Sequence, residues 1–289
     1  MIAHRKKGEV RSPDRVSAYN SKEEPVQNPV VSKSGLLPKL GRRYFLVGGA
    51  GALAGVAAGG AGYRDLGPKD RKHASEFYHR AHSIIDRRAQ QKRETVAALK
   101  AKYETAVFGR ARVWDLIQKL SLCIDESDVS LFCTSQLVHV QQVLEGMERD
   151  SVQDRDLLTA ALVHDVGKVL LLTDELPENV VGTTGRISEA PQGAGLDQVV
   201  FQFGHGEMIY SRLKDHVPAH LAWLLRYHGT NLADVEPFLS DQDHHYRDRY
   251  LIPFRKYDGG TKSYNHVPKI KLAKYRDLIE ETFPQPILF

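Results

Sequence analysis

The chain contains few of the features that mark disulfide-rich, redox or nucleotide-binding proteins. Its 289 residues include two cysteines, Cys123 and Cys133, which make neither a disulfide framework nor a paired-cysteine redox or zinc motif. No glycine-rich phosphate loop follows a strand-like segment, and few segments alternate between apolar and polar residues. We therefore expect buried thiols and little β-sheet.

The charge is also unremarkable for a protein of this size. The net charge is +4 and the pI about 8.9, but much of the excess comes from scattered Lys and Arg of the N-terminal part. No basic motif is interleaved with aromatic residues, so no nucleic-acid partner is expected. Hydrophobic residues make up 42% of the chain, which is usual for a soluble globular protein.

The N-terminal part divides into two segments that do not have the pattern of a packed domain. Residues 1–40 are polar and have no hydrophobic period, which predicts a disordered leader. In residues 41–63, Arg42-Arg43 precede an uncharged Gly/Ala-rich run, as in a twin-arginine export signal. A Gly/Ala linker and a marginal membrane span are the alternatives. We expect an exported or membrane-associated protein if this signal is real, with the export machinery or membrane as partner, and a cytoplasmic one otherwise.

From about residue 70 the hydrophobic pattern is helical. Apolar residues recur three and four positions apart, with charges on the opposite face. The predicted helices are 94–102, 113–122, 137–147, 154–172, 196–213, 218–227 and 272–281. The fold class predicted for 70–289 is therefore mostly α, as one domain without internal repeats.

His164-Asp165 lies inside the otherwise apolar, helix-forming run 157–168. Burying a carboxylate beside an imidazole is costly unless a cation compensates, and a bound metal ion is the commonest compensation. Adjacent residues of a helix diverge by about 100°, so both side chains can contact one dinuclear centre if the carboxylate lies between the ions.

Other histidines and aspartates follow in comparable settings. The six candidate metal ligands are His139, His164, Asp165, His205, His228 and Asp258. Four imidazoles and two carboxylates without a thiolate suit two ions of iron or manganese better than a structural zinc site. A lone histidine on an apolar face, such as His139, is by itself more often a core residue. Asp241 and Asp243 lie in a polar stretch and are expected to face solvent.

The order of these ligands is that of the HD-domain superfamily, and the surrounding residues indicate a narrower group. The relevant blocks are Asp125-Glu126-Ser127-Asp128, His164-Asp165-Val166-Gly167-Lys168, Val180-Val181-Gly182-Thr183-Thr184, Gly204-His205-Gly206-Glu207, Arg226-Tyr227-His228 and Phe254-Arg255-Lys256-Tyr257-Asp258-Gly259-Gly260-Thr261-Lys262. From about residue 94 to the C-terminus, the chain resembles a myo-inositol oxygenase.

This resemblance implies an HD-domain-like helical bundle around a dinuclear centre of two iron ions, mixed-valent Fe(II)/Fe(III), with O2 as co-substrate. It implies cleavage of the ring of myo-inositol, or of a close polyol, to D-glucuronate. His139, His164 and Asp258 would hold one iron, His205 and His228 the other, and Asp165 would bridge them. Lys168 would be catalytic. The implied substrate-binding residues are Asp125, Glu126, Ser127, Lys168, Gly182, Thr183, Gly229 and Lys262.

The positions at which this sequence departs from the family pattern all belong to the substrate pocket of the family. The segment between Gly182 and Gly195 is short, and Thr183 stands where the family has an aspartate. Gly229 replaces a serine after the fourth histidine, and the family's early arginine has only Arg80 as a candidate counterpart. Metal and reaction type are therefore more firmly predicted than the substrate.

Three alternatives remain open at this point. An HD-type phosphohydrolase would use the same metals to activate water, and an oxygenase of hydroxyphosphonates would share the centre; both need additional cations, for which Lys168 and Arg186 are the candidates. A non-enzymatic metal- or partner-binding helical module descended from such an enzyme is the third. Retention of six candidate ligands weighs against the last.

Overall fold

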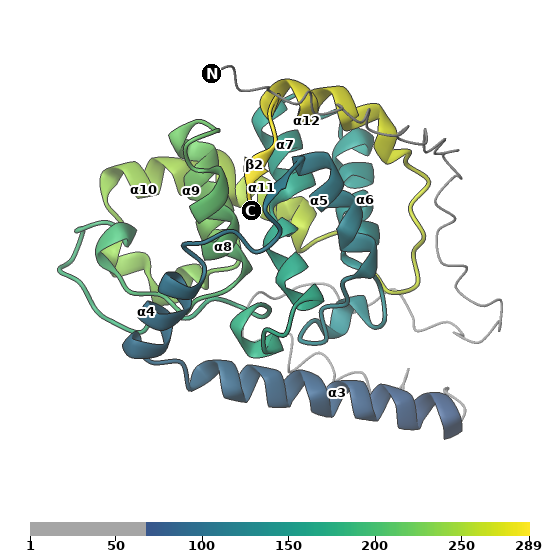
Figure 1. Ribbon diagram of the computed structural model, residues 1–289, viewed down its shortest axis with the longest axis horizontal. Coiled ribbons are helices and arrows are strands. Elements are labelled where there is room, and N and C mark those ends of the chain that lie inside the picture. The colour runs from purple at the N-terminus through teal and green to yellow at the C-terminus, as the bar shows by residue number, and fades with distance from the viewer. Residues whose placement is uncertain (1–67) are drawn as a thin grey trace, which may run out of the picture. The chain divides into compact units, whose positions relative to one another are not determined.

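The computed structural model describes residues 68–289, so the predictions for 1–40 and 41–63 lie outside the described residues. Within the described part the protein is mostly helical, as predicted (Figure 1). The α-helices are α3 (Pro68–Ala89), α4 (Arg93–Lys102), α5 (Val113–Lys119), α6 (Gln136–Arg149), α7 (Arg155–Val163), α8 (His205–Leu213), α9 (Ala219–Tyr227), α10 (Asp241–Tyr246), α11 (Ile252–Asp258) and α12 (Arg276–Thr282).

Helices that span a bilayer are not found from residue 68 onward, where none is both long and apolar enough. The strands of this part are short: β1 (Arg110–Ala111) pairs antiparallel with β2 (Ile287–Leu288). This pairing attaches the C-terminal segment to the beginning of α5. Of the two thiols, Cys123 is buried, as expected, whereas Cys133 is exposed, contrary to expectation.

Two groups of helices build the core. In Figure 1, α5, α6 and α7 lie on the right and α8 and α9 on the left, with α11 between them in this view. α11 packs on α6 and α7, whereas α8 packs mainly on α9. Side-chain caps fix the beginnings of two of these helices: Ser135 accepts a hydrogen bond from Val138 N–H, and Asp154 accepts from the N–H groups of Asp156 and Leu157.

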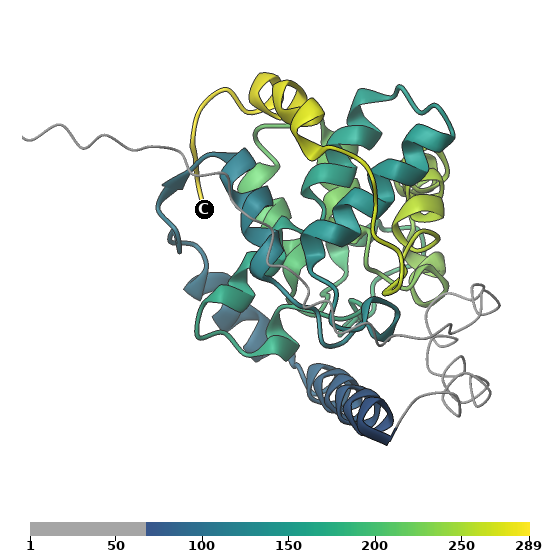
Figure 2. The ribbon, with the colours of Figure 1, turned by 90° about the vertical axis from the view of Figure 1, so that its right-hand side faces the viewer.

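α3 lies outside this bundle, along its lower edge in Figures 1 and 2. It packs on the turns at 129–131 and 177–179 through a buried face. Phe77, Ala81, Ile84 and Arg88 recur on that face at helical spacing, and all are buried. The Arg88 guanidinium donates to the carbonyl oxygens of Glu178, Thr183 and Phe203, which anchors α3 to the bundle.

The predicted helix 154–172 is interrupted at the metal-ligand pair. α7 ends at Val163, and a 3-10 helix runs from Val166 to Leu172. A Cβ atom at Gly167 would lie 2.2 Å from the carbonyl oxygen of His205, so only glycine permits the backbones to approach this closely. Because the chain tightens here, α8 can bring His205 beside His164-Asp165.

The predicted helix 196–213 is wrong in its first half. A 3-10 turn covers Leu196–Gln198, and the α-helix begins only at His205. Between them the backbone forms hydrogen bonds with 185–188, including an antiparallel bridge between Arg186 and Phe201. Pairing with a distant segment therefore overrides the local helical pattern.

α10 and α11 are joined without a loop by a π-helix, Arg247–Leu251. Pro253, at the beginning of α11, has no N–H to donate and cannot fit a regular helix interior. The wider π turn accommodates the proline, and such turns are frequent at functional sites. The resulting register directs the end of α11, with Asp258, into the bundle.

Asp243 is buried rather than solvent-facing, which corrects the expectation from the polar sequence around it. Its carboxylate accepts hydrogen bonds from the indole N–H of Trp223 at 2.6 Å, from Leu196 N–H at 3.0 Å, and from Ser240 N–H and hydroxyl at 3.0 and 2.7 Å. One carboxylate thus connects α10 to α9 and to the 3-10 turn. Asp241, in contrast, is exposed, as expected.

We predict that Asp243→Ala lowers the free energy of unfolding by about 2–4 kcal/mol, because it leaves several buried donors without an acceptor. Chemical denaturation measures the change. Asp241→Ala, on the same helical turn but exposed, is the matched control and should cost less than about 1 kcal/mol. Equal losses in the two variants would contradict the structural role of Asp243.

Candidate metal centre

The six predicted ligands converge in the middle of the bundle, mostly from helix ends. His139 lies in the first turn of α6, His164 caps the end of α7, and Asp165 follows it. His205 begins α8, His228 caps the end of α9, and Asp258 ends α11. The four histidines and Asp165 are buried, and the Asp258 side chain is 13% exposed.

The two oxygens of Asp165 face two different groups of imidazoles. Asp165 Oδ2 lies 3.3 Å from His164 Nε2 and 3.7 Å from His139 Nε2. Asp165 Oδ1 lies 3.5 Å from His205 Nε2 and 3.9 Å from His228 Nε2. Among the residues described, the groups that can each hold a metal ion are His139–His164–Asp165 and Asp165–His205–His228, which share the carboxylate.

Asp258 belongs with the first group. Its Oδ1 lies 3.0 Å from His139 Nε2 and 3.6 Å from His164 Nε2. The first group therefore has two imidazoles and a carboxylate of its own, whereas the second has two imidazoles. The second group therefore offers fewer protein donor atoms than the first.

The hydrogen bonds of the imidazoles determine which nitrogen faces inward. The Nδ1 atoms of His164, His205 and His228 lie 3.1, 2.9 and 2.9 Å from the carbonyl oxygens of Ala161, Val180 and Leu225. A carbonyl only accepts, so these Nδ1 atoms carry hydrogen, and in the neutral ring Nε2 is left with a lone pair.

Two of these lone pairs face each other, because His205 Nε2 lies 3.0 Å from His228 Nε2. His164 Nε2 lies 3.4 Å from His139 Nε2, which is itself 3.0 Å from Asp258 Oδ1. Two buried acceptors at such distances repel unless a cation lies between them. A carbonyl-oriented imidazole is also the usual arrangement of a metal-bound histidine. The residues present thus fit a metal centre on the chemistry of their donor atoms.

Titration preferences agree with this assignment for His139 and His205. Burial lowers the pKa of His139 and, together with Lys168, holds the pKa of His205 well below its usual range, so both favour the neutral, ligating form. For His164, burial by itself would lower the pKa, but Asp165 outweighs it and raises this pKa, which favours the charged form. Burial by itself would raise the pKa of Asp165, but His164 and Lys168 outweigh it and hold this pKa well below its usual range. For Asp258, Lys262 and His139 do the same.

Lys168 lies beside the Asp165 carboxylate, and acceptors surround its ammonium group. Its Nζ is 2.8 Å from Asp125 Oδ2, 3.1 Å from both Asp165 oxygens and 2.8 Å from Gln136 Oε1. The lysine is buried, yet the two carboxylates raise its pKa, so the ammonium stays charged. Lys262 Nζ lies 2.8 Å from Asp128 Oδ2 and 4.0 Å from Asp258 Oδ1.

The remaining predicted substrate residues lie around this centre but do not all face it. Ser127 N–H donates to Asp125 Oδ1 at 2.9 Å, and Gly182 (φ +94°) lies against Ser127 and Arg88. Glu126 instead pairs with Arg80 of α3 at 2.9 Å, and Thr183 is exposed.

At Gly229, an added Cβ would meet nothing closer than Thr184 Oγ1 at 3.9 Å and His205 Nε2 at 4.0 Å. Gly229 therefore leaves free space beside the second group of ligands.

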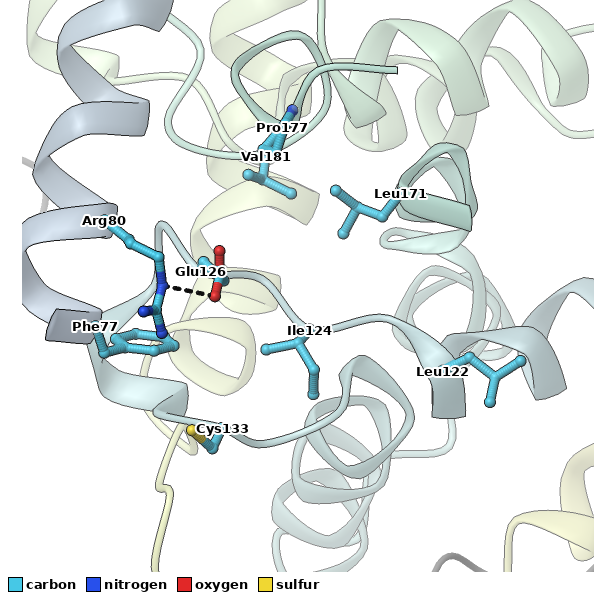
Figure 3. A pocket seen from close by; sticks show the side chains of 9 residues that line it. All are labelled: Phe77, Arg80, Leu122, Ile124, Glu126, Cys133, Leu171, Pro177 and Val181. Atoms are coloured by element: carbon cyan, nitrogen blue, oxygen red, sulfur yellow. Dashed lines mark hydrogen bonds and ion pairs between the residues drawn. The ribbon is translucent and has the colours of Figure 1, made fainter. Parts of the chain in front are cut away.

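A separate cavity of about 390 Å3 lies between α3 and the bundle. Figure 3 shows the side chains that line it. The Arg80–Glu126 ion pair lies on one side, and Leu122, Ile124 and Leu171 line the other. None of the six candidate ligands lines it. Glu126 thus belongs to the outer side of the Asp125–Ser127 loop.

Sequence reasoning missed two residues of the centre, Gln136 and Arg255. Gln136 lies one helical turn before His139 and is buried, so its place on the same apolar face was a usable signal. Arg255 contacts only main-chain carbonyls of another segment, which no sequence pattern reports.

A sequence model described as myo-inositol oxygenase matches residues 71–191. Related curated proteins carry the same name. A probable inositol oxygenase of Oryza sativa subsp. japonica is 27% identical over 74% of this chain and 80% of its own length. Inositol oxygenase 4 of Arabidopsis thaliana is 26% identical over 76% of this chain and 80% of its own length. Inositol oxygenase of Bos taurus is 24% identical over 76% of this chain and 93% of its own length. The chain is therefore similar to the myo-inositol oxygenase family over residues 71–191 and to curated inositol oxygenases over about three quarters of its length.

Proposed function

We propose that this protein is an inositol oxygenase. It would be a non-haem di-iron enzyme that cleaves the ring of myo-inositol, or of a close polyol, with O2 to give D-glucuronate or the corresponding acid. The observation that carries the proposal is the pair of nitrogen-and-oxygen ligand groups sharing the two oxygens of Asp165, with the Lys168 ammonium 3.1 Å from the same carboxylate.

In this proposal His139, His164 and Asp258 would hold one iron, His205 and His228 would hold the other, and Asp165 would be shared by the two. The absence of thiolates suits iron. When bound, the two irons would supply Lewis acidity toward a diol and the redox capacity to use O2. The second position would have fewer protein ligands, and Gly229 leaves free space beside it. Both features favour this position as the binding site of the substrate diol.

Lys168 would act as a hydrogen-bond donor and not as a base, because its ammonium is held in the charged form. Its three N–H groups are engaged by Asp125, Asp165 and Gln136, so a substrate oxygen must replace one of these acceptors. The Gln136 carbonyl is the only neutral acceptor of the three and is therefore the easiest to displace. Once bound, the ammonium would stabilise negative charge on the substrate oxygen.

The same contacts weigh against the phosphate-directed alternatives. A phosphate or phosphonate group needs cations that are available to bind it. Lys168 and Lys262 are each paired with aspartates, and Arg186 bonds to the carbonyl of Asp234 and to Glu189. We therefore favour an uncharged polyol as substrate.

The test is metal analysis of anaerobically purified protein, followed by oxygen uptake with myo-inositol. We expect about two irons per chain and oxygen consumption that depends on inositol. Two metals with phosphate release from phosphate esters and no oxygen uptake would support the phosphohydrolase instead. A protein without metal after reconstitution would refute both.

Replacing Asp165 with alanine should remove iron from both positions, because one carboxylate serves both ions. Metal content per chain measures this directly. Asp156→Ala is the control, since this aspartate lies in the first turn of α7 and pairs with His220 at 2.6 Å. If Asp165→Ala keeps the iron content of the wild type, Asp165 is not the bridge.

Lys168→Met should retain iron but reduce inositol-dependent oxygen uptake by about 10²- to 10³-fold, the usual cost of losing one donor to a developing charge. Lys214→Met, at an exposed position of the same charge, should change neither quantity. Turnover near the wild-type rate in Lys168→Met would show that this lysine only supports the fold.

A further inference from the structure

Arg255 is bound to the end of the helix that carries His228. Its Nε lies 3.0 Å and its Nη2 2.7 Å from the carbonyl oxygen of His228. Nη2 also donates to the carbonyl of Thr230 and, at 3.5 Å, to that of Tyr227. These carbonyls belong to the last turn of α9 and to the residues just beyond it.

The chemistry of a helix end explains this arrangement. The last carbonyls of a helix have no partner within it, and they carry the negative end of the helix dipole. A guanidinium is a planar fork of several donors and can bond three carbonyls at once, which a lysine ammonium cannot reproduce in the same geometry.

Arg255 also connects the two groups of ligands. It lies in α11, three residues before Asp258, and α11 packs on α6 and α7, which position His139 and His164. All ligands of the first group therefore belong to one set of packed helices. His205 and His228 lie on α8 and α9, which pack on each other, and α9 also packs on α7. The guanidinium reaches from α11 to the main chain of a ligand of the second group.

We propose that Arg255 is a positioning residue that fixes His228, and with it the second metal position, relative to Asp258 of the first. The inference rests on the proposed dinuclear centre. Residues in the layer outside metal ligands change metal affinity by about 10- to 100-fold when they are replaced. Here the effect should fall selectively on the position formed by His205 and His228.

The decisive variant is Arg255→Lys, which retains the positive charge but not the fork. Wild type and variant are loaded anaerobically with Fe(II) and dialysed against a graded series of chelator concentrations, and the iron retained per chain is measured. We expect the wild type to keep about two irons, and the variant to release one of them at a roughly tenfold lower chelator concentration while keeping the other. His228→Ala, which removes the ligand itself, sets the reference for loss of one position.

The matched control is Arg212→Lys. Arg212 is also partly buried and donates to main-chain carbonyls, those of Tyr103 and Thr105, away from the metal ligands. It should retain both irons at the chelator concentrations that the wild type tolerates. The melting temperature of each metal-free variant separates positioning from general stability, because a positioning role leaves the metal-free Arg255→Lys protein no less stable than metal-free Arg212→Lys.

The possible outcomes are distinguishable. If Arg255→Lys keeps both irons as firmly as the wild type, or loses both together with a lowered melting temperature, the positioning role is wrong while the dinuclear centre stands. If the wild type itself holds fewer than two metals, the proposed function fails, and this inference fails with it. Should Arg255→Lys not fold, Arg255→Gln, which keeps a donor amide without the charge, takes the same test.

Discussion

The structure depends on a buried carboxylate that faces imidazoles on two sides. Each oxygen of Asp165 lies 3.3–3.9 Å from a pair of histidine nitrogens that come from different helices. Without a cation, a buried carboxylate among inward-facing lone pairs would be strongly destabilising, since the loss of hydration would not be repaid. Lys168 compensates part of this charge. The remaining negative charge needs further cations, which bound metal ions would supply.

The candidate metal ligands could be predicted from the sequence because the residues that mark them are close together or have similar apolar neighbours. His164 and Asp165 are adjacent in an apolar run, and four further ligands lie in comparable settings. All six come together in the fold. Helix type was predicted well where the hydrophobic period was strong, as in 137–147, which falls within α6. The helical class of the fold followed from the same periodicity.

What the sequence did not reveal depends on contacts between distant segments. The break after Val163 is set by the approach of Gly167 to His205, and the extended stretch before α8 by pairing with 185–188. Asp243 looked solvent-facing in a polar stretch, but Trp223 and Leu196 donate to it in the interior. The outward direction of Glu126 likewise depends on Arg80 in α3. Long-range hydrogen bonds override local propensity in each case.

The spacing of the ligands along the chain has a consequence for the order of events in maturation. His139 and Asp258 are separated by 119 residues, and their side chains meet at 3.0 Å. No short fragment of the chain brings such ligands together, and closing so long a loop costs entropy that only the packed core repays. In the proposed centre, a metal ion would therefore find its full set of ligands only on a domain that has already folded. On this proposal, maturation would run from folding to metal loading.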